Sequence, residues 1–317
     1  MTIVRQAIAA EAPDTPIRGI ILMIGFSIFG PFIDMFAKLT SAEMPVGEIA
    51  LARFVVQGAL LFAFAAAIGV LHRPKRREML LHLARGGVLL IATMLIVAAF
   101  KVMPLADTLA IFFVMPMIVT LMGAVFLGEP VGWRRIAASL VGFGGALLVI
   151  QPSFGEFGLT AFLPLAAAVF FAIYLIMTRR MGRRMNQIVL QAYTAIAAVV
   201  LIVPVLALGP TIGWQPITPI IPQGIDWLWL LGVGLSTVVA HMLLTYAFAM
   251  ASIAILAPLQ YLEIVSATIL GYLVFNDLPN ALTFLGIAII VSSGIYIFFR
   301  ERTVVLAIAR QASARAE

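Results

Sequence analysis

The 317-residue chain contains no cysteine, only three histidines and few charged residues, which make up 11% of it. The absence of cysteine excludes disulfides, thiolate nucleophiles and Cys-ligated metal sites. A soluble domain has about 25% charged and about 45–50% apolar residues. This chain is 63% hydrophobic, with a mean hydropathy of +1.13. Too few charges remain to cover a surface in water, so the composition excludes a soluble globule.

Enzyme signatures are missing as well. The chain has no glycine-rich phosphate loop ending in Lys-Ser/Thr and no HExxH motif, and His72 and His82 fall in one basic stretch. We therefore expect no catalytic residues, no cofactor and no metal site. The net charge of +6 could indicate a nucleic-acid partner. However, the basic residues lie between apolar runs, which is typical of the cytoplasmic side of a membrane protein, so we expect no nucleic acid.

Ten apolar runs dominate the chain. Each is about 20 residues long, the length that a helix needs to cross roughly 30 Å of hydrocarbon, and none alternates as a membrane β-strand would. Their approximate bounds are 19–38, 46–71, 86–103, 106–127, 133–150, 158–178, 187–208, 227–250, 253–275 and 281–299. The sequence thus predicts an all-α polytopic membrane protein with ten transmembrane helices in a lipid bilayer.

The basic residues predict the orientation. With ten spans, 17 of the 20 Lys and Arg residues, Arg85 among them, fall in tails and connectors on the same side as the N-terminus. Connectors rich in Lys and Arg face the cytoplasm. We therefore expect cytoplasmic tails at residues 1–18 and 301–317, in a bacterial-type inner (plasma) membrane.

The chain also repeats itself. Ala99-Phe100 corresponds to Ala247-Phe248 at an offset of 148, and Pro130 corresponds to Pro279 at 149. Residues 19–150 and 151–300 would then form two five-helix repeats. Because five is odd, the second repeat would insert upside down, an architecture characteristic of secondary transporters with a midplane site.

On these residues the chain resembles the EamA branch of the drug/metabolite transporter superfamily. The matching stretches are Arg53-Phe54, Met103 to Asp107, Phe126 to Pro130 with Trp133-Arg134-Arg135, Gly142 to Gly145, Tyr261-Leu262-Glu263 and Gly286 to Gly294. One feature departs from the family: its Glu-Pro pair is divided here between Pro116 and Glu263. The resemblance implies transport of a small metabolite, with cargoes that include amino acids, S-adenosylmethionine, riboflavin and drugs.

Ionisable residues inside spans are the first candidates for function, because each costs roughly 2.5–3.5 kcal/mol to insert at a helix centre. Glu263 and His241 lie about 15–17 Å from the turn between their spans, near the midplane. They could bind a polar substrate group, exchange a proton or simply join two helices. Asp34 and Arg53 lie at equal depth and predict an ion pair or gate. At the inner mouth, Glu129 is expected to pair with Arg134 and Arg135.

Aromatic and proline residues complete the candidate site. Near-midplane rings could stack on a flat ligand, although packing is the simpler explanation for any one of them. The predicted substrate-binding set is Glu263, His241, Tyr261, Gln260, Phe112, Phe29 and Tyr174. Pro116 and Pro258 interrupt spans and are candidate hinges, because proline removes a helix donor.

The inventory favours a secondary transporter of a small amphipathic molecule. Riboflavin uptake is preferred by a small margin over amino-acid or drug export, and an intramembrane enzyme or a pore remains as an alternative. A homodimer is left open.

Overall fold

The computed structural model describes the backbone of residues 15–40, 43–103, 105–129, 132–150, 158–276 and 280–314. The expected N-terminal tail up to residue 14 lies outside the described residues. The first repeat contains α1 (Pro16–Leu39), α2 (Val46–Ala67), α3 (Arg76–Val102), α4 (Leu105–Phe112), α5 (Met115–Leu127) and α6 (Trp133–Ile150). The second contains η1 (Gly158–Ala161), α7 (Phe162–Gly182), α8 (Gln187–Ile212), η2 (Gln215–Ile217), α9 (Asp226–Met250), α10 (Ile253–Leu256), η3 (Ala257–Tyr261), α11 (Leu262–Phe275) and α12 (Ala281–Ala314).

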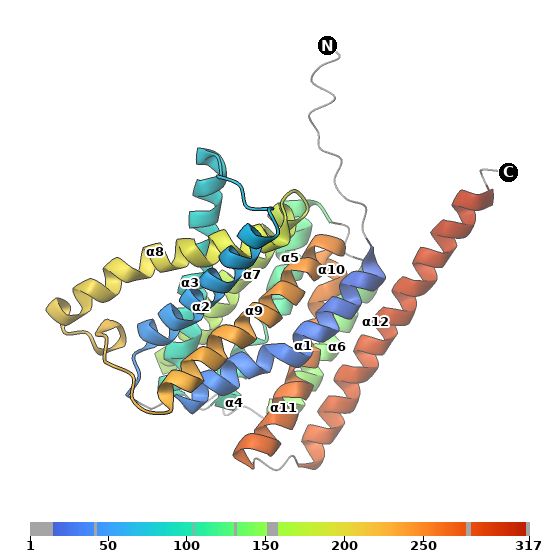
Figure 1. Cartoon of the computed structure of the whole chain (residues 1–317). Coiled ribbons are helices and arrows are strands. Elements are labelled where there is room, and N and C mark those ends of the chain that lie inside the picture. Colours follow the sequence, from blue (N-terminus) through green and yellow to red (C-terminus); the bar gives the residue numbers. More distant parts are fainter. Residues whose placement is uncertain are drawn as a thin grey trace.

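These elements form ten spans within the described residues. Eight segments are long and apolar enough to cross a membrane, and two shorter apolar helices cover 115–127 and 136–149. Figure 1 shows α1 beginning and α12 ending at the same end of the bundle, as an even number of spans requires. We call this the terminal end and the opposite one the distal end. The predicted ten-span helical fold is confirmed.

The two repeats share the same local irregularities. The fourth span is broken between α4 and α5, just before Pro116, and the ninth is broken at η3, which contains Pro258. Proline lacks the donor that would continue the helix. The two broken spans also end alike, at Gly128 (φ 65°) and Asn276 (φ 58°), both left-handed and 148 residues apart. Left-handed backbone favours glycine and asparagine and stops a helix. The repeat is thus visible in backbone geometry as well as in sequence.

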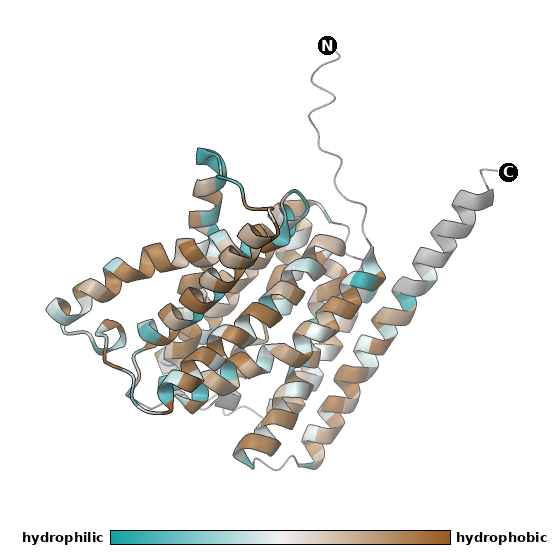
Figure 2. Cartoon of the chain, in the orientation of Figure 1, coloured by the Kyte–Doolittle hydropathy of each residue, from teal (hydrophilic) through white to brown (hydrophobic). Residues whose placement is uncertain are grey.

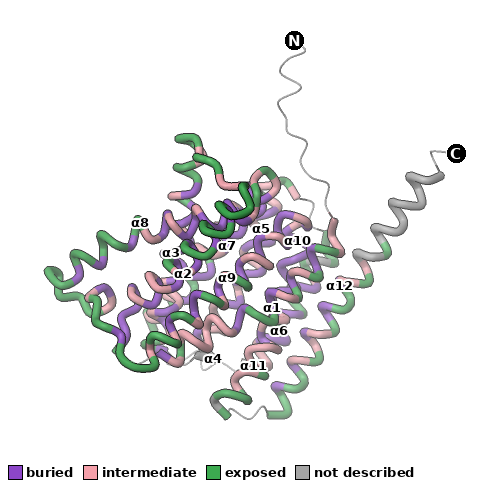
Figure 3. The backbone as a smooth tube through the Cα atoms, in the orientation of Figure 1, coloured by how far each residue is buried: buried purple, intermediate pink, exposed green. Residues whose placement is uncertain are grey.

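The outside of the bundle is apolar. Leu121, Val125 and Phe126 on α5 are 62%, 76% and 64% exposed. Figure 2 shows hydrophobic residues over the flanks of the helices, and Figure 3 shows that buried residues gather where the helices face one another. An exposed apolar band of this extent needs lipid around it, because soluble proteins rarely expose large apolar patches.

Two predicted boundaries need correction. α3 begins at Arg76, ten residues earlier than expected, so His82 and Arg85 lie in a span and are buried rather than in a connector. The span expected to end at residue 208 continues in α8 to Ile212. The tenth span is found at Ala281–Arg300, close to the expected 281–299, and helix α12 continues beyond it to Ala314. Hydropathy windows end a span at clustered charges, whereas a helix continues wherever its polar side chains find partners.

Candidate functional site

A small pocket lies where the two repeats meet. Its volume is about 80 Å³, and its walls come from α1 to α5 of the first half and from α7, α9 and α11 of the second. The lining residues are Phe26, Gly30, Ile33, Asp34, Arg53, Ala92, Thr93, Ile96, Leu109, Phe112, Met115, Phe171, His241 and Glu263. At 1.5 Å per residue along each span, they lie near the midplane or in the distal half.

The pocket unites five of the predicted residues: Asp34, Arg53, Phe112, His241 and Glu263. They come from α1, α2 and α4 of the first repeat and from α9 and α11 of the second, so the structure brings together candidates that the chain alone could only place by depth. Phe112 packs on Phe171, with ring centroids 5.9 Å apart.

Arg53 and His241 are joined directly rather than through carboxylates. Arg53 is 7% exposed; its Nη2 lies 2.7 Å from His241 Nε2, and its Nη1 donates to Thr93 Oγ1 at 2.9 Å. A guanidinium can only donate, so His241 Nε2 accepts and the neutral ring carries its proton on Nδ1. That nitrogen then donates to Tyr174 Oη at 3.1 Å. His241 therefore holds Arg53 in place, and both of its nitrogens are occupied.

Asp34 and Glu263 face the same pocket without protein partners. No hydrogen bond or ion pair is found for either carboxyl among the described residues, so the expected Asp34–Arg53 contact is replaced by Arg53's bonds to His241 and Thr93. Glu263 lies against α1 at Gly30, where a Cβ would come within 2.5 Å of its Oε1. Asp34 lies one turn further along α1, on the same face as Gly30. The two acids thus share one wall of the pocket.

Sequence reasoning missed a second cluster, centred on Arg85. This residue is fully buried and its donors reach Thr178, Thr194, Leu190 O, Gln191 and Tyr174 Oη, at 2.9 Å to Thr178 and 3.1 Å to Tyr174. Its guanidinium also lies 4.5 Å from the Tyr174 ring centroid. Tyr174, itself buried, therefore links Arg85 to His241 behind the pocket.

A periodic signal for this cluster exists in the sequence. Polar residues recur four apart within apolar spans, as in Arg53 and Gln57, Tyr174 and Thr178, and His241 and Thr245. Residues four apart share a helix face. Together with Gln191, which donates to Tyr174 Oη at 3.0 Å and also to Thr245, these faces meet in the bundle interior.

The terminal end is closed by an ion pair between the repeats. Glu129, which follows α5, accepts from Arg179 Nε at 2.9 Å and from the Ile253 N–H at 2.8 Å. Arg179 is 2% exposed and also donates to carbonyls of Phe248 and Ala249. We call this cluster the terminal lock. It corrects the expected pairing of Glu129: Arg134 stacks on Trp133 instead, and the side chain of Arg135 lies outside the described residues.

The remaining predicted residues lie away from the pocket lining. Phe29 is 43% exposed on the outer face of α1, because a step of three residues from Phe26 turns the helix by about 300°. Tyr261 packs on Phe113 and Phe143, and neither its hydroxyl nor the buried amide of Gln260 has a partner among the described residues. Pro116 and Pro258 lie at the two helix breaks.

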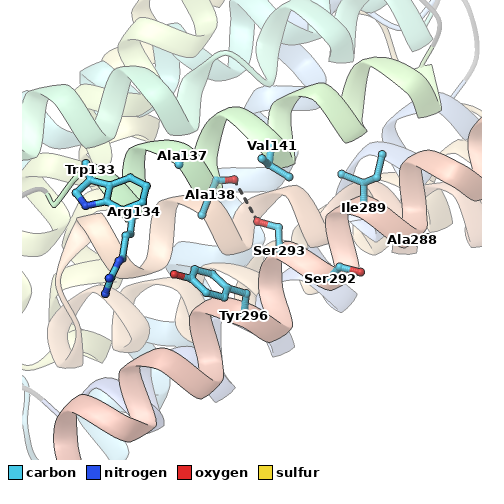
Figure 4. Close-up of a pocket in the computed structure, with 10 residues that line it drawn as sticks. All are labelled: Trp133, Arg134, Ala137, Ala138, Val141, Ala288, Ile289, Ser292, Ser293 and Tyr296. Atoms are coloured by element: carbon cyan, nitrogen blue, oxygen red, sulfur yellow. Dashed lines mark hydrogen bonds between the residues drawn. The ribbon is translucent and has the colours of Figure 1, made fainter.

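A larger cavity of about 510 Å³ is lined by none of the predicted substrate-binding residues. Figure 4 shows it as a groove between α6 and α12, with Trp133, Arg134 and Tyr296 toward one end and Ser293 donating to Ala138 O at 3.1 Å. Trp133 is 73% exposed, so the groove opens on the outside of the bundle. It is separate from the pocket between the repeats.

Comparison with known proteins agrees with this architecture. The chain is 26% identical to a riboflavin transporter of Vibrio cholerae, over 89% of this chain and 93% of that protein. It is 26% identical to an S-adenosylmethionine uptake transporter of Rickettsia bellii (85% and 89% covered) and 27% identical to the pseudopaline exporter CntI of Pseudomonas aeruginosa (86% and 93% covered). A solved crystal structure with 21% identity superposes with a TM-score of 0.70 over 86% of this chain and 96% of that one, which shows the fold.

The family profile covers both repeats. The profile of the EamA-like transporter family matches residues 17–151 and again residues 158–299, which together are most of the chain. The matches divide the chain close to the expected repeat boundary at 150/151. The protein is a multi-pass membrane transporter rather than an enzyme, and it belongs to the EamA-like transporter family.

Proposed function

We propose that this protein is a secondary transporter that moves a small organic metabolite by alternating access around the pocket between the repeats. The observation that carries the proposal is the pocket itself, which has walls from both repeats and unpartnered charged groups at mid-bilayer depth. Charged groups are costly inside a membrane and mark substrate or ion pathways. A site at a repeat interface changes its access when one repeat rocks against the other.

The position of the pocket supports the assignment of this structure to one state of the alternating-access cycle. The lining residues lie at the midplane or toward the distal end, while the terminal lock joins the repeats at the other end. With both termini in the cytoplasm, as the basic residues predict, this is a conformation closed on the cytoplasmic side. Opening to the cytoplasm then requires the Glu129–Arg179 pair to separate.

We infer riboflavin as the cargo and uptake as the direction of transport from the sequence. Export of an amino acid or of a drug or other metabolite is the alternative. Relatives named as riboflavin transporters occur in two bacteria, at 26% and 29% identity. Rings for stacking line the pocket at Phe26, Phe112 and Phe171. At about 80 Å³, however, the pocket is far below the roughly 300–1,000 Å³ of drug-sized sites, so a flavin requires it to widen.

The test is exchange in liposomes. Liposomes that contain the purified protein and are loaded with unlabelled solute should accumulate the labelled form of that solute saturably. The Glu263→Gln variant should abolish this exchange while leaving expression and thermal stability unchanged. Glu43→Gln is the matched control, because Glu43 is an exposed carboxylate near the distal end that lies outside the pocket. Normal exchange by Glu263→Gln would refute the site, linear unsaturable flux would favour a pore, and product formation without translocation would favour an enzyme.

The assembly is a separate proposal. A homodimer in the membrane would be seen as twice the chain mass in light scattering of the detergent-solubilised protein. A single-chain mass would contradict it without affecting the transport mechanism.

A further inference from the structure

We infer that the groove between α6 and α12 binds an anionic phospholipid, with one acyl chain along the groove and the phosphate at Arg134. This site lies on the outside of the bundle, and it is independent of the cargo and of the pocket between the repeats. The groove is the cavity of about 510 Å³ shown in Figure 4, and one wall comes from each repeat.

Small side chains on both helices create the groove. α6 and α12 approach closely at Gly145 and Gly286, where a Cβ on Gly286 would come within 2.5 Å of the Gly145 carbonyl oxygen. Ser293 also donates to Ala138 O, and this bond joins the same two helices. The helices therefore stay in contact, while the residues beside that contact leave space that opens to the surrounding lipid. Most of these lining residues have short side chains: Ala137, Ala138, Val141, Ala288 and Ser292.

The groove has a length and depth that suit one acyl chain. The lining covers eight helical steps on each wall, from Trp133 to Val141 and from Ala288 to Tyr296, which is about 12 Å. One leaflet contributes about 15 Å of hydrocarbon, half of the roughly 30 Å core. The tenth span ends at Arg300, one turn beyond Tyr296. The groove therefore begins near the membrane interface of the terminal end and runs toward the midplane.

Aromatic and basic side chains lie at the interfacial end of the groove. Trp133 and Tyr296 are both exposed there, and these residue types are enriched at the level of the lipid headgroups. Arg134 lines the same end, with its guanidinium carbon 5.5 Å from the Trp133 ring centroid. No hydrogen bond or ion pair is found for Arg134 within the described residues. Its donors therefore remain for a phosphate at the mouth of the groove.

The charge of the sequence at this end favours an anionic headgroup. Residues 133–135 at the start of α6 and residues 300–302 at the end of the tenth span contain four arginines and one glutamate, which sum to +3. Basic pockets between transmembrane helices bind anionic headgroups on the cytoplasmic side. With the termini in the cytoplasm, as the basic residues predict, the lipid comes from the inner leaflet, whose surface is negative.

A second copy of the chain fits this groove less well than a lipid. Homodimers are mostly two-fold symmetric, so the same patch meets itself. About an axis along the membrane normal, both Arg134 side chains would enter one interface at the same depth, where like charges repel. A phospholipid brings the opposite charge to Arg134 and an apolar chain to the small residues, so it complements both parts of the groove.

Trp133 can report what occupies the groove. The full-length protein is placed in phosphatidylcholine bilayers, and phosphatidylglycerol or phosphatidylcholine with brominated chains, which quench tryptophan on contact, is added in increasing mole fraction. The Trp133 signal is the difference between the unmodified protein and Trp133→Phe, because Trp214, Trp227 and Trp229 remain in both. Brominated phosphatidylglycerol should quench half of this signal at a mole fraction about fivefold lower than brominated phosphatidylcholine, as about 1 kcal/mol from one arginine gives. Equal quenching by the two lipids would overturn the proposal.

Two variants, each paired with its own Trp133→Phe reference, separate the headgroup from the acyl chain. Arg134→Gln should make the two lipids equally effective. Arg77→Gln is the matched control, because it removes an exposed arginine at the terminal end that lies outside the groove, and the fivefold difference should persist. Ala288→Phe adds a ring at an exposed position of the groove wall and should abolish the selective quenching without lowering the melting temperature. A fivefold difference that survived in Arg134→Gln or in Ala288→Phe would contradict the assignment.

The mass of the detergent-solubilised protein identifies the other possible occupant. Twice the chain mass, together with weak and equal quenching of Trp133 by both lipids, would mean that a second copy fills the groove and that the phospholipid is excluded. Selective quenching supports the phospholipid at either mass. The measurement needs no transported solute, so it stands or fails separately from the proposed transport function.

Discussion

Arg53 and Arg85 are buried in neighbouring spans of the same repeat, but their surroundings differ. Arg85 has hydrogen bonds from all three of its nitrogens to oxygen acceptors on α7 and α8. Arg53 lines the pocket and has a buried Nε that finds no partner in the part of the chain that the structure describes. The carboxylates follow the same division: Glu129 is bound by Arg179 and the Ile253 N–H, whereas Glu263 has no hydrogen bond or ion pair within the described residues.

On the proposed function, this difference separates polar groups that hold the bundle together from groups that bind the cargo. The saturated charged groups, in the Arg85 cluster and the terminal lock, lie toward the terminal end, whereas Arg53, Asp34 and Glu263 lie at the midplane and in the distal half. Neutral buried polar atoms that find no partner among the described residues occur at the terminal end as well, on His82 and Ser252. Burial and charge are alike in both regions, so neither identifies the site. Among the charged groups compared here, the distinguishing feature is whether each is satisfied within the protein, because an unsatisfied buried group costs about 1–3 kcal/mol or more.

The largest effect is expected at Arg85. Arg85→Gln removes most of the donors that reach Thr178, Thr194 and Tyr174, and hydrogen bonds to charged groups contribute about 1.5–3 kcal/mol each. We expect a loss of at least about 3 kcal/mol, seen as a large fall in the melting temperature of the detergent-solubilised protein.

Arg53→Gln is the matched comparison. This variant loses two hydrogen bonds, whereas Arg85→Gln loses the larger set around Arg85. It should melt closer to the unmodified protein but fail to transport. If Arg85→Gln had the higher melting temperature of the two variants, the number of hydrogen bonds that an arginine makes within the protein would not identify the arginine that stabilises the fold.

The terminal lock should give the next largest effect. Glu129→Gln removes the charge from a buried pair that connects the repeats, and this weakens closure by about 1–3 kcal/mol. The chain contains no cysteine, so a single Ala249→Cys, whose native side chain is 8% exposed, can report opening. Labelling by a maleimide should become several-fold faster in the Glu129→Gln background.

Glu78→Gln is the control for the lock. Glu78 also lies near the terminal end, but it contacts Lys75 N and His72 and therefore joins residues near the start of α3 only. Its substitution should leave the labelling rate unchanged. Equal rates in all backgrounds would mean that Glu129 does not control access.

Much of this architecture follows from sequence, whereas the division of the polar groups does not. Run lengths and the offset of 148 predict the spans and the repeat, because both are local or periodic properties. Depth within a span predicts two pairs, Asp34 with Arg53 and His241 with Glu263, and does not predict that all four line one pocket. It could not show that Arg53 would bind His241 and leave Asp34 alone, since that choice depends on how α2, α3 and α9 pack. Arg85 was assigned to a connector for the same reason: its acceptors lie on α7 and α8, about 90 to 110 residues away.

The smallest effect is expected at Gly30, the residue of α1 against which the Glu263 carboxylate lies. Gly30→Ala places a Cβ within 2.5 Å of Glu263 Oε1, so the carboxylate must move away from α1. We expect the half-saturation concentration for transport to rise a few-fold with little change in melting temperature, because alanine favours the helix by roughly 0.5–1 kcal/mol.

Gly144→Ala on α6 is the control that separates displacement of the Glu263 carboxylate from the general effect of alanine on helix stability. The Cβ of this variant would meet nothing within 4 Å. The variant should gain the same helix stabilisation without altering transport. If Gly30→Ala transported with an unchanged half-saturation concentration, the position of the Glu263 carboxylate would not matter to the cargo. The comparison between charged groups with and without partners in the described part of the protein would then rest on Arg53 alone.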